Sequence, residues 1–346
     1  MRNTKIASVV VTYNRKRLLL DCLHALTGQS YPLDAIFIVD NGSTDDTPTF
    51  LKQHDVLAAT PDGLTDTWIH HCSIDTGTTG KGKVDIYYVR LSTNRGGSFG
   101  FYEGLHRARE LNFDWIWIMD DDSRPHEDSL SKMAAYFDRP NIAAIVGAVR
   151  YPDGPIDLKH RGMIRYKHIF PRLQSPLPER KYHAEETIPI EAASFVGLLV
   201  NRQSIDLAGY PDPKFFLGHD DIEYCMRLAV CGKILLVPDS VIYHAEEVKK
   251  NYKRVIFFGK RFYRPPYEKL WLKYYSFRNL IWLGKRYIKP RLRFHIEALF
   301  YYLIHVFLIL LFDDRKMRRI RFYTSSFQDG LNGIFDNEKP EKILYG

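Results

Sequence analysis

The chain has 346 residues, 45% hydrophobic and 26% charged, which excludes a disordered chain and fits one large domain or two ordinary ones. Its formal net charge of +8 indicates an anionic partner such as nucleic acid, anionic lipid or a phosphorylated substrate. The four cysteines have no CxxC or zinc-site spacing, so we expect reduced thiols in a cytosolic protein. The apolar run at residues 6–11 is too short for a signal peptide.

Short apolar runs alternate with helical patterns through the first 150 residues. Residues 6–11 and 35–39 are typical of buried strands, and the apolar spacing at 18–26 predicts a helix between them. This order predicts a right-handed βαβ unit and a parallel sheet. The alternation continues with expected elements at 85–91 (strand), 101–111 (helix), 115–119 (strand), 127–137 (helix) and 142–149 (strand).

Two stretches break this alternation. Residues 54–83 hold Gly, Thr, Asp and His with little apolar periodicity, and we expect an inserted functional or mobile loop. His70, His71 and Cys72 lie in it but lack the partner spacing of a metal site. Residues 150–190 are rich in Pro and Arg and show little order, and 192–200 is again strand-like.

Three carboxylates, Asp120, Asp121 and Asp122, follow the apolar strand at 115–119 directly. Open α/β sheets place their ligands at the carboxyl ends of strands, where these side chains fall. Adjacent like charges repel, and a hard divalent cation such as Mg²⁺ or Mn²⁺ would offset them. The alternative is a solvated acidic turn in which Asp122 or Ser123 caps the next helix.

Further polar clusters follow other predicted elements. The Gly-rich loop at 94–100 opens a helix and is either a plain turn or a place where backbone N–H groups approach a phosphate or sugar. Residues 219–223 put one His and three acids at a helix start; dipole capping explains one acid but not all three. His244 follows a strand and gains a metal-binding role only if it faces Asp120 and Asp122.

From residue 248 the chain is basic and aromatic. Residues 267–287 predict an amphipathic helix, and the apolar run at 296–312 is shorter than the ~20 residues of a membrane-spanning helix. Basic residues flank that run, which favours a helix lying in a membrane interface over anionic lipid. A core helix with snorkelling arginines and a contact between copies are the alternatives, and the oligomeric state stays open.

Five segments now occur together in order, at residues 9–15, 39–45, 94–97, 120–122 and 219–224. Together they resemble glycosyltransferase family 2, whose members are inverting nucleotide-sugar enzymes of the GT-A fold. The runs at 96–104 and 220–224 resemble those of bacterial galactofuranosyltransferases and rhamnosyltransferases. The resemblance covers about residues 1–245 and implies an α/β fold, with a Rossmann-like, mostly parallel sheet flanked by helices.

The resemblance implies a catalytic domain at 1–247 and a mainly helical region at 248–346 that contacts membrane, acceptor or another copy. It also implies donor contacts. Thr12, Tyr13 and Asp40 would hold the base and ribose of the nucleotide, and Gly96 and Gly97 would approach the donor.

The same resemblance implies a metal centre and a base. Asp120 and Asp122 would bind Mg²⁺ or Mn²⁺, His244 matches a metal-binding His of galactofuranosyltransferases, and Asp121 would lie near the ribose or sugar. In the second cluster Asp221 matches the general base.

The remaining members of that cluster, His219, Asp220 and Glu223, would contact the acceptor. A base is needed because the acceptor hydroxyl must lose its proton.

The expected function is therefore metal-dependent, inverting transfer of a sugar to a growing bacterial surface glycan, of the O-antigen or cell-wall kind. UDP-galactofuranose is the favoured donor and dTDP-rhamnose the alternative. A polyprenyl-diphosphate-linked acceptor would suit the basic tail, and the expected location is the inner face of the cytoplasmic membrane. A metal-dependent phosphohydrolase or nucleotidyltransferase would also use clustered aspartates but lacks a nucleophile motif or P-loop here. A nucleic-acid binder lacks any recognisable binding motif.

Overall fold

A computed structural model describes residues 4–61, 67–75, 82–244, 252–257 and 259–346. The chain forms two compact units. The N-terminal unit comprises Met1–Met163, Pro176–Pro213 and Asp221–Glu246. The C-terminal unit comprises Ile164–Ser175, Lys214–Asp220 and Glu247–Gly346. Two short segments from earlier in the chain therefore belong to the same unit as the last hundred residues.

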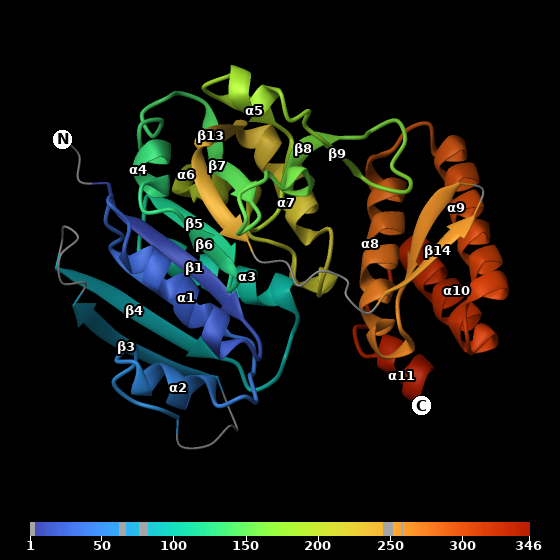
Figure 1. The fold of residues 1–346 in the computed structure, drawn as a ribbon, viewed down its shortest axis with the longest axis horizontal. Helices are drawn as coiled ribbons and strands as arrows, with labels where there is room; N and C mark the ends of the chain where they lie inside the picture. The colour runs from blue at the N-terminus through green and yellow to red at the C-terminus, as the bar shows by residue number, and fades with distance from the viewer. Residues whose placement is uncertain (1–3, 62–66, 76–81, 245–251, 258) are drawn as a thin grey trace. The chain divides into compact units, whose positions relative to one another are not determined.

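One large mixed sheet organises the N-terminal unit, in the order β10-β13-β7-β12-β5-β1-β2-β4-β3 with β6 paired to β13 (Figure 1). Its centre is parallel, because β1 pairs in parallel with β2 and β5, and β2 with β4. The strands are β1 (Ile6–Thr12), β2 (Ala35–Asp40), β3 (Trp68–Asp75), β4 (Lys83–Arg90), β5 (Trp115–Asp120), β6 (Ser123–Pro125), β7 (Ile142–Arg150), β10 (Ile188–Ile190), β12 (Leu198–Asn201) and β13 (Lys233–His244).

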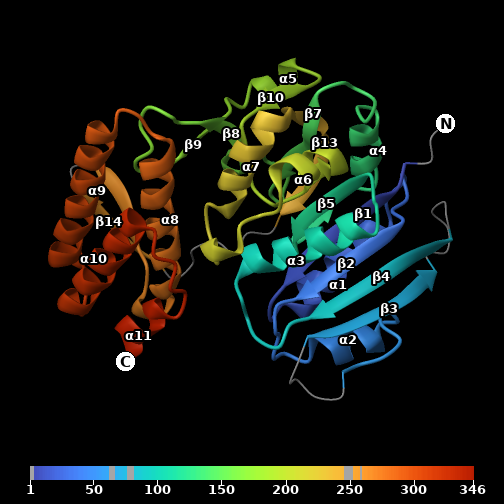
Figure 2. The ribbon, with the colours of Figure 1, turned by 180° about the vertical axis from the view of Figure 1, so that it is seen from behind.

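Helices cover both faces of this sheet. One apolar layer packs the buried sides of α1, α2 and α4 on the sheet, and a second packs α3, α6 and α7 on the opposite face, which Figure 2 turns toward the viewer. Because both faces are covered, β1 and β2 are buried along their whole length. The helices are α1 (Lys16–Thr27), α2 (Thr47–Gln53), α3 (Gly97–Glu110), α4 (Ser129–Ala134), α6 (Arg202–Ala208) and α7 (Asp220–Cys231).

The structure departs from the predicted elements in three places. Within the predicted loop 54–83, β3 forms an antiparallel edge strand on β4, with half-buried and exposed side chains alternating. The strand-like run 192–200 divides, since β11 (Ala192–Ala193) joins a small sheet with β8 (Arg161–Ile164) and β9 (Gln174–Pro176), and β12 inserts antiparallel between β5 and β7. The stretch 150–190 also holds η1 (Leu158–His160) and α5 (Lys181–Ala184). Irregular segments of this kind carry no period that sequence patterns can detect.

The C-terminal unit is a helical cluster with one hairpin. Its elements are η2 (Pro213–Phe215, which begins at the unit boundary), β14 (Lys253–Phe257), β15 (Lys260–Arg264), η3 (Tyr267–Lys269), α8 (Trp271–Tyr287), α9 (Arg291–Phe312), α10 (Lys316–Asn332) and α11 (Lys339–Tyr345). Helix α8, predicted as amphipathic, is largely buried and includes the buried polar side chains Arg278 and Asn279. It is therefore the core helix of this unit, and its aromatic residues pack against α9 and α10.

Candidate active site at the sheet edge

The central parallel strands end at one edge of the sheet. In the register of the sheet, Thr12 on β1 lies opposite Asp40 on β2, and Val11 lies opposite Asp120 on β5. Asp40 in turn lies opposite Arg90 on β4. The carboxyl ends of four strands thus bring the predicted polar residues to the same edge, as expected for a ligand crevice in an open α/β sheet.

Asp121 is almost fully buried, and two side chains of the segment 9–15 contact its carboxylate. Thr12 donates its hydroxyl to Asp121 Oδ2 at 2.7 Å, and the Arg15 guanidinium lies 3.3 Å from Oδ1. Burial raises the pKa of Asp121 to about 6, although Arg15 and Thr12 oppose the shift. The site therefore holds a carboxyl group whose charge is only partly compensated by the protein.

Asp122 lies between Arg15 and His244. Arg15 Nη1 is 2.9 Å from Asp122 Oδ2, and His244 Nε2 is 3.1 Å from Oδ1. The register of β13 on β6 explains the second contact, because His244 is paired with Ser123, the residue after Asp122. Burial raises the pKa of Asp122, but His244 and Arg15 outweigh burial and hold the pKa below its usual value. The sequence condition on His244 was that it face Asp120 and Asp122, and the structure meets it for Asp122.

These two residues fit a divalent cation. Asp122 Oδ1, the oxygen that faces His244 Nε2, is buried and makes no well-directed hydrogen bond to another described residue. Adjacent ligand atoms of an octahedral cation held at about 2.1 Å lie about 3 Å apart, close to the 3.1 Å between Asp122 Oδ1 and His244 Nε2. Carboxylate oxygen suits both Mg²⁺ and Mn²⁺, whereas imidazole nitrogen suits a transition-metal ion, so the pair fits Mn²⁺ better than Mg²⁺.

The predicted three-residue ligand set is not formed. Within the described parts of the chain, no three His, Cys, Asp or Glu side chains converge on one point, so Asp120 does not join Asp122 and His244. The reason is local: β5 ends at Asp120, and Asp121 and Asp122 form a turn, so the period-2 alternation that would align residues 120 and 122 is lost.

Two of the residues predicted to contact the nucleotide, Tyr13 and Asp40, differ in their exposure. Tyr13 is 42% exposed at the sheet edge and is open to a ligand. Asp40 is fully buried: its Oδ1 accepts from Ser43 N at 2.7 Å, its Oδ2 accepts from the Tyr88 hydroxyl, and Arg90 Nε lies 3.5 Å away. In this state Asp40 shapes the turn after β2, and its contact with a nucleotide stays a prediction.

Gly96 and Gly97 lie where a backbone can approach a ligand. Gly96 has φ +85°, and α3 starts at Gly97, which leaves the first N–H groups of that helix pointing into the loop. Asn94 Oδ1 accepts from Asn41 Nδ2 at 3.0 Å and from Gly96 N at 2.9 Å. A Cβ on Gly42, at φ +77°, would lie 2.8 Å from the Thr93 carbonyl carbon. The Gly-rich loop and the turn after β2 are therefore fixed to each other.

The second acidic cluster divides between the two units. His219, at φ +65°, and Asp220 belong to the C-terminal unit, whereas Asp221 belongs to the N-terminal unit. In the C-terminal unit, Asn279 Nδ2 donates to the Phe215 and Gly218 carbonyl oxygens and holds the loop that carries His219 on α8. Desolvation lowers the pKa of His219 to about 4, so His219 is a neutral contact group at pH 7.

Asp221 has the properties of a proton acceptor. It is the second residue of helix α7, is half-buried, and accepts from Ile222 N at 2.8 Å. Desolvation raises its pKa to about 6, opposed by backbone hydrogen bonds and by Arg161. Glu223, in contrast, accepts with both oxygens from Arg227 Nε, at 2.9 and 3.1 Å, which favours a structural role over the predicted acceptor contact.

Several residues of the site had not been singled out from the sequence. Arg15 was visible in the first motif, and a cation beside an acidic triplet could have been expected. His160 and Asp157 had no signal, because they lie in the unpatterned stretch 150–190. The His160 ring lies 5.0 Å from the His244 ring, edge to face, with Nδ1 2.8 Å from Ser194 Oγ and Nε2 3.5 Å from Asp157 Oδ2. His160 is thus held by Ser194 and Asp157 and packs edge to face against the His244 ring.

Arg161 is the other residue missed. It is fully buried and donates to the carbonyl oxygens of Gly147, His160 and Val196. Burial lowers its pKa to about 10, and its charge acts on Asp221. Because Arg161 follows His160 directly, one short segment connects the surroundings of His244 with those of Asp221.

Comparison with known proteins adds a family, relatives and a fold. Residues 8–61 and 78–206 match the family model described as glycosyl transferase family 2. A galactofuranosyltransferase, GlfT1 of Mycolicibacterium smegmatis, is 28% identical over 229 residues, 66% of each chain and so just under two thirds of the relative's length. The dTDP-rhamnosyl transferase RfbF of Shigella flexneri is 25% identical over 72% of this chain and 79% of RfbF.

The fold also recurs among solved structures. The crystal structure of GalNAc-T7 with UDP, GalNAc and Mn²⁺ superposes with a TM-score of 0.56 at 14% identity, over 98% of this chain and 58% of that one. At this identity the likeness concerns the fold alone. It confirms the predicted GT-A fold, in which a mostly parallel sheet flanked by helices is followed by a helical C-terminal region.

Proposed function

Because the chain belongs to glycosyl transferase family 2, we propose that it moves a sugar from a nucleoside-diphosphate donor to an acceptor hydroxyl, with inversion and with a divalent cation. The observation that carries the proposal is the convergence of Asp122 Oδ1 and His244 Nε2, 3.1 Å apart, beside a buried Asp121 at the carboxyl edge of the sheet. Family membership also favours glycosyl transfer over the phosphohydrolase and nucleic-acid-binding alternatives.

The favoured donor sugar is galactofuranose. The support is the similarity to GlfT1, which is 28% identical over 229 residues. Rhamnose from dTDP-rhamnose is the second candidate, supported by the similarity to RfbF over a longer part of the chain. A furanose and a deoxyhexose present different hydroxyl patterns, so a binding site selects one of them by its polar contacts.

The proposed mechanism assigns each site residue a task. Asp122 and His244 would hold Mn²⁺ or Mg²⁺, which, when bound, offsets the negative charge that grows on the leaving diphosphate. Tyr13 and the N–H groups at Gly96 and Gly97 would contact the donor. Arg15 keeps the acidic turn in place before the donor arrives, because it spans Asp121 and Asp122.

Asp221 would be the general base. It takes the proton of the acceptor hydroxyl as the oxygen attacks the anomeric carbon from the face opposite the diphosphate, and this single displacement inverts the configuration. The raised pKa of about 6 supports the role, because a base works best when its pKa lies near the working pH. His219 and Asp220 would contact the acceptor from the loop that begins α7.

The proposed acceptor is a bacterial surface glycan carried on polyprenyl diphosphate, which places the reaction at the cytoplasmic face of the membrane. The net charge of +8, concentrated late in the chain, supports an anionic lipid-linked acceptor. An acceptor of this kind diffuses only in the bilayer, so an enzyme that uses it gains from binding the same surface.

The test is a donor screen with a matched pair of nucleotide sugars. UDP-galactofuranose and dTDP-rhamnose, each with Mn²⁺, are offered with a polyprenyl-diphosphate disaccharide, and products are measured by mass. We expect one galactofuranosyl unit to be added, and no transfer in excess EDTA. Transfer from dTDP-rhamnose alone would replace the donor assignment. Full transfer in EDTA would contradict the proposed function. Hydrolysis of the donor at the same rate with and without acceptor would also contradict it.

A further inference from the structure

Helix α9, Arg291–Phe312, is apolar on two opposite faces. The inner face includes Phe294, Ala298 and Ile309, which are buried within the C-terminal unit. The outer face carries large apolar side chains that are each between 48% and 74% exposed; they are Leu292, Ile296, Leu299, Phe300, Leu303, Phe307, Leu310 and Leu311. Their spacing of three or four residues places them in one stripe along the helix. We call this stripe the outer face of α9.

Isolated exposed apolar residues are ordinary, but a continuous stripe of eight is not. Among the described residues, α9 is also the one helix long and apolar enough to cross a membrane by length and composition. The apolar run at 296–312 is shorter than a membrane-spanning helix, whereas helix α9 itself has 22 residues and is about 33 Å long. The outer face therefore needs a partner that covers an apolar strip of that length.

Basic side chains stand at both ends of the outer face. Lys289 and Arg291 are exposed at its start, and Lys316, Arg318 and Arg321 are exposed just beyond its end. None of these five forms an ion pair with another described residue, so their charges are available to a partner. Basic groups at both ends of an apolar strip match an anionic lipid surface, where the headgroup phosphates lie beside the acyl chains.

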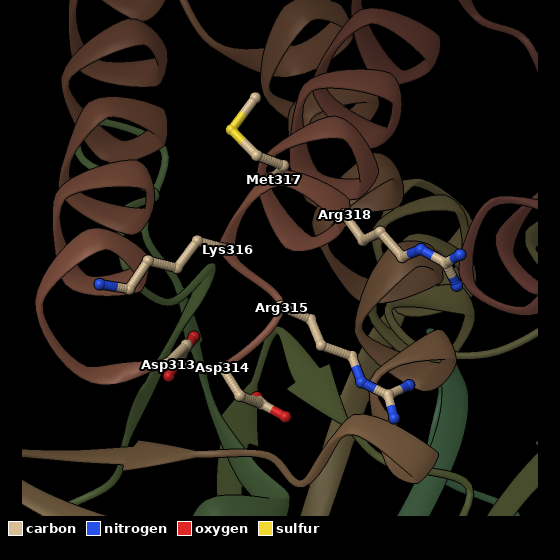
Figure 3. A pocket seen from close by; sticks show the side chains of 6 residues that line it. All are labelled: Asp313, Asp314, Arg315, Lys316, Met317 and Arg318. Atoms are coloured by element: carbon tan, nitrogen blue, oxygen red, sulfur yellow. The ribbon is translucent and has the colours of Figure 1, made fainter.

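A pocket of about 780 Å³ lies at the end of α9, and it too combines basic side chains with an apolar one (Figure 3). It is lined by Asp313, Asp314, Arg315, Lys316, Met317 and Arg318. Its acids are already compensated within the unit, because Asp313 pairs with Arg264 and Asp314 with Arg319. The exposed cations in the pocket are therefore in excess, and the exposed Met317 next to them adds to the apolar surface.

We propose that the outer face of α9 lies in the interface of an anionic bilayer, with the helix axis along the membrane plane and the basic groups at its two ends among the headgroup phosphates. A second copy of the chain fits less well. An antiparallel, symmetric pairing of two outer faces would bring the basic start of one α9 against the basic end of the other, and like charges would repel.

A crossing helix also fits less well. The inner face of α9 packs on α8 and α10, whose side chains include the buried Arg278, Arg319 and Asp329. A crossing α9 would draw these polar partners into hydrocarbon or lose its inner contacts, both of which are unfavourable. This proposal concerns where the enzyme binds, and it stands whether or not the transfer reaction proposed above is correct.

The test is flotation of the full chain with vesicles of phosphatidylcholine alone or mixed with 30% phosphatidylglycerol. We expect binding to the mixed vesicles, weakened at least tenfold on pure phosphatidylcholine. Leu303→Glu with Phe307→Glu should abolish it. The matched control, Leu207→Glu with Val230→Glu, changes two exposed apolar residues of the N-terminal unit by the same charge and should float like the wild type. Melting temperatures of both variants report whether they fold.

A second pair isolates the charge contribution. Arg291→Glu with Lys316→Glu should weaken binding at least tenfold, whereas Lys52→Glu with Arg180→Glu, exposed cations of the N-terminal unit, should not. Three results would overturn the proposal: a wild type that does not float, a folded Leu303→Glu, Phe307→Glu variant that floats normally, or a wild-type dimer that this variant converts to monomer. Resistance to extraction at pH 11 would also contradict it, because it would show a crossing helix.

Discussion

The N-terminal unit buries charged side chains, whereas the C-terminal unit exposes apolar ones. At the sheet edge of the N-terminal unit, the carboxylates of Asp121 and Asp122 are 3% and 8% exposed, although charged side chains are rarely buried. In the C-terminal unit, apolar side chains such as Leu303 and Phe307 are about half exposed on α9. Arg15 partly compensates the buried carboxylates from inside the chain, whereas the exposed apolar side chains of α9 are not covered by other described residues.

The two regions differ in what they need from a ligand or partner. A compensated buried charge keeps a site ordered before its ligand binds, so the sheet edge can exist without a cation or donor. An apolar face exposed to water is unfavourable, and only an external partner that covers it removes that cost. The sheet edge is therefore expected to respond to isosteric polar substitutions through activity, and the outer face of α9 through binding to a surface.

The largest expected effect is on the general base. Asp221→Asn keeps the shape of the side chain and removes its ability to accept a proton, so transfer should fall roughly 10²–10⁴-fold. Binding of UDP with Mn²⁺, measured by calorimetry, should stay within a few-fold of wild type. The control is Asp220→Asn, which makes the same change at the neighbouring acid, assigned to the C-terminal unit. Loss of transfer in Asp220→Asn with near-normal transfer in Asp221→Asn would reverse the assignment of these two residues.

The acidic turn should give the next largest effect. Asp122→Asn removes a charge next to His244 while retaining the side chain volume, and kcat/KM should fall roughly 10²–10³-fold as transition-state charge loses its support. Asp206→Asn, which breaks a surface pair with Arg109, should leave kcat/KM unchanged. Initial rates over a range of Mn²⁺ concentrations separate weaker metal binding from a slower step. Equal rates for Asp122→Asn and wild type would remove Asp122 from the mechanism.

The pH dependence should follow from Asp221. Its pKa of about 6 means that the base is ionised above pH 6, so kcat/KM should fall about tenfold per pH unit below it. For stability the sign is opposite. An acid whose pKa is higher in the folded than in the unfolded chain, about 6 against about 3.9, holds its proton better when folded. Wild-type stability should therefore fall as pH rises from about 4 to about 6.

Asp221→Asn tests this sign. The variant lacks the ionisation, so at pH 7 it should be more stable than wild type by about 1–2 kcal/mol, a value reduced because the side chain keeps some exposure. At pH 4 the two proteins should unfold at the same denaturant concentration. A variant that is less stable than wild type at pH 7 would show that Asp221 is ionised at lower pH than described.

The smallest effect should separate the two faces of α9. Leu303→Gln on the outer face should change the free energy of unfolding by no more than about 0.5 kcal/mol, because the side chain is 51% exposed. Ile309→Gln on the buried inner face should cost about 3–5 kcal/mol, since it places an amide in an apolar contact. Urea unfolding measures both. Comparable costs at the two positions would mean that the outer face is packed in solution.

The strands and the position of the acidic turn were predictable, because continuous apolar runs such as Trp115–Met119 can only be buried strands or buried helix segments, and the flanking signals decide between them. The contact of His244 with Asp122 was conditional, because it depends on the β13–β6 register. That Asp120, Asp122 and His244 do not gather at one point among the described residues accords with a two-residue turn after β5, which has no periodicity.

Other features had no local signal. His160 and Asp157 lie in a segment without apolar periodicity, and only the folded chain brings them to His244. The prediction for α8 was an amphipathic helix, and its nearly complete burial had no local signal because Tyr, Lys and Arg are commonly exposed, although Arg278 here donates to carbonyl groups inside the unit. An outer face on α9 could not be separated from a core face, since both are apolar.

Pulsed electron paramagnetic resonance of Mn²⁺ can show whether Asp122 and His244 together hold a divalent cation. With wild-type protein, Mn²⁺ and UDP, we predict electron spin-echo modulation from one histidine nitrogen bound to Mn²⁺. His244→Ala should remove this modulation and weaken Mn²⁺ binding, whereas His160→Phe should keep it. A bound Mn²⁺ with no nitrogen modulation in wild type, or modulation that persists in His244→Ala, would contradict the account.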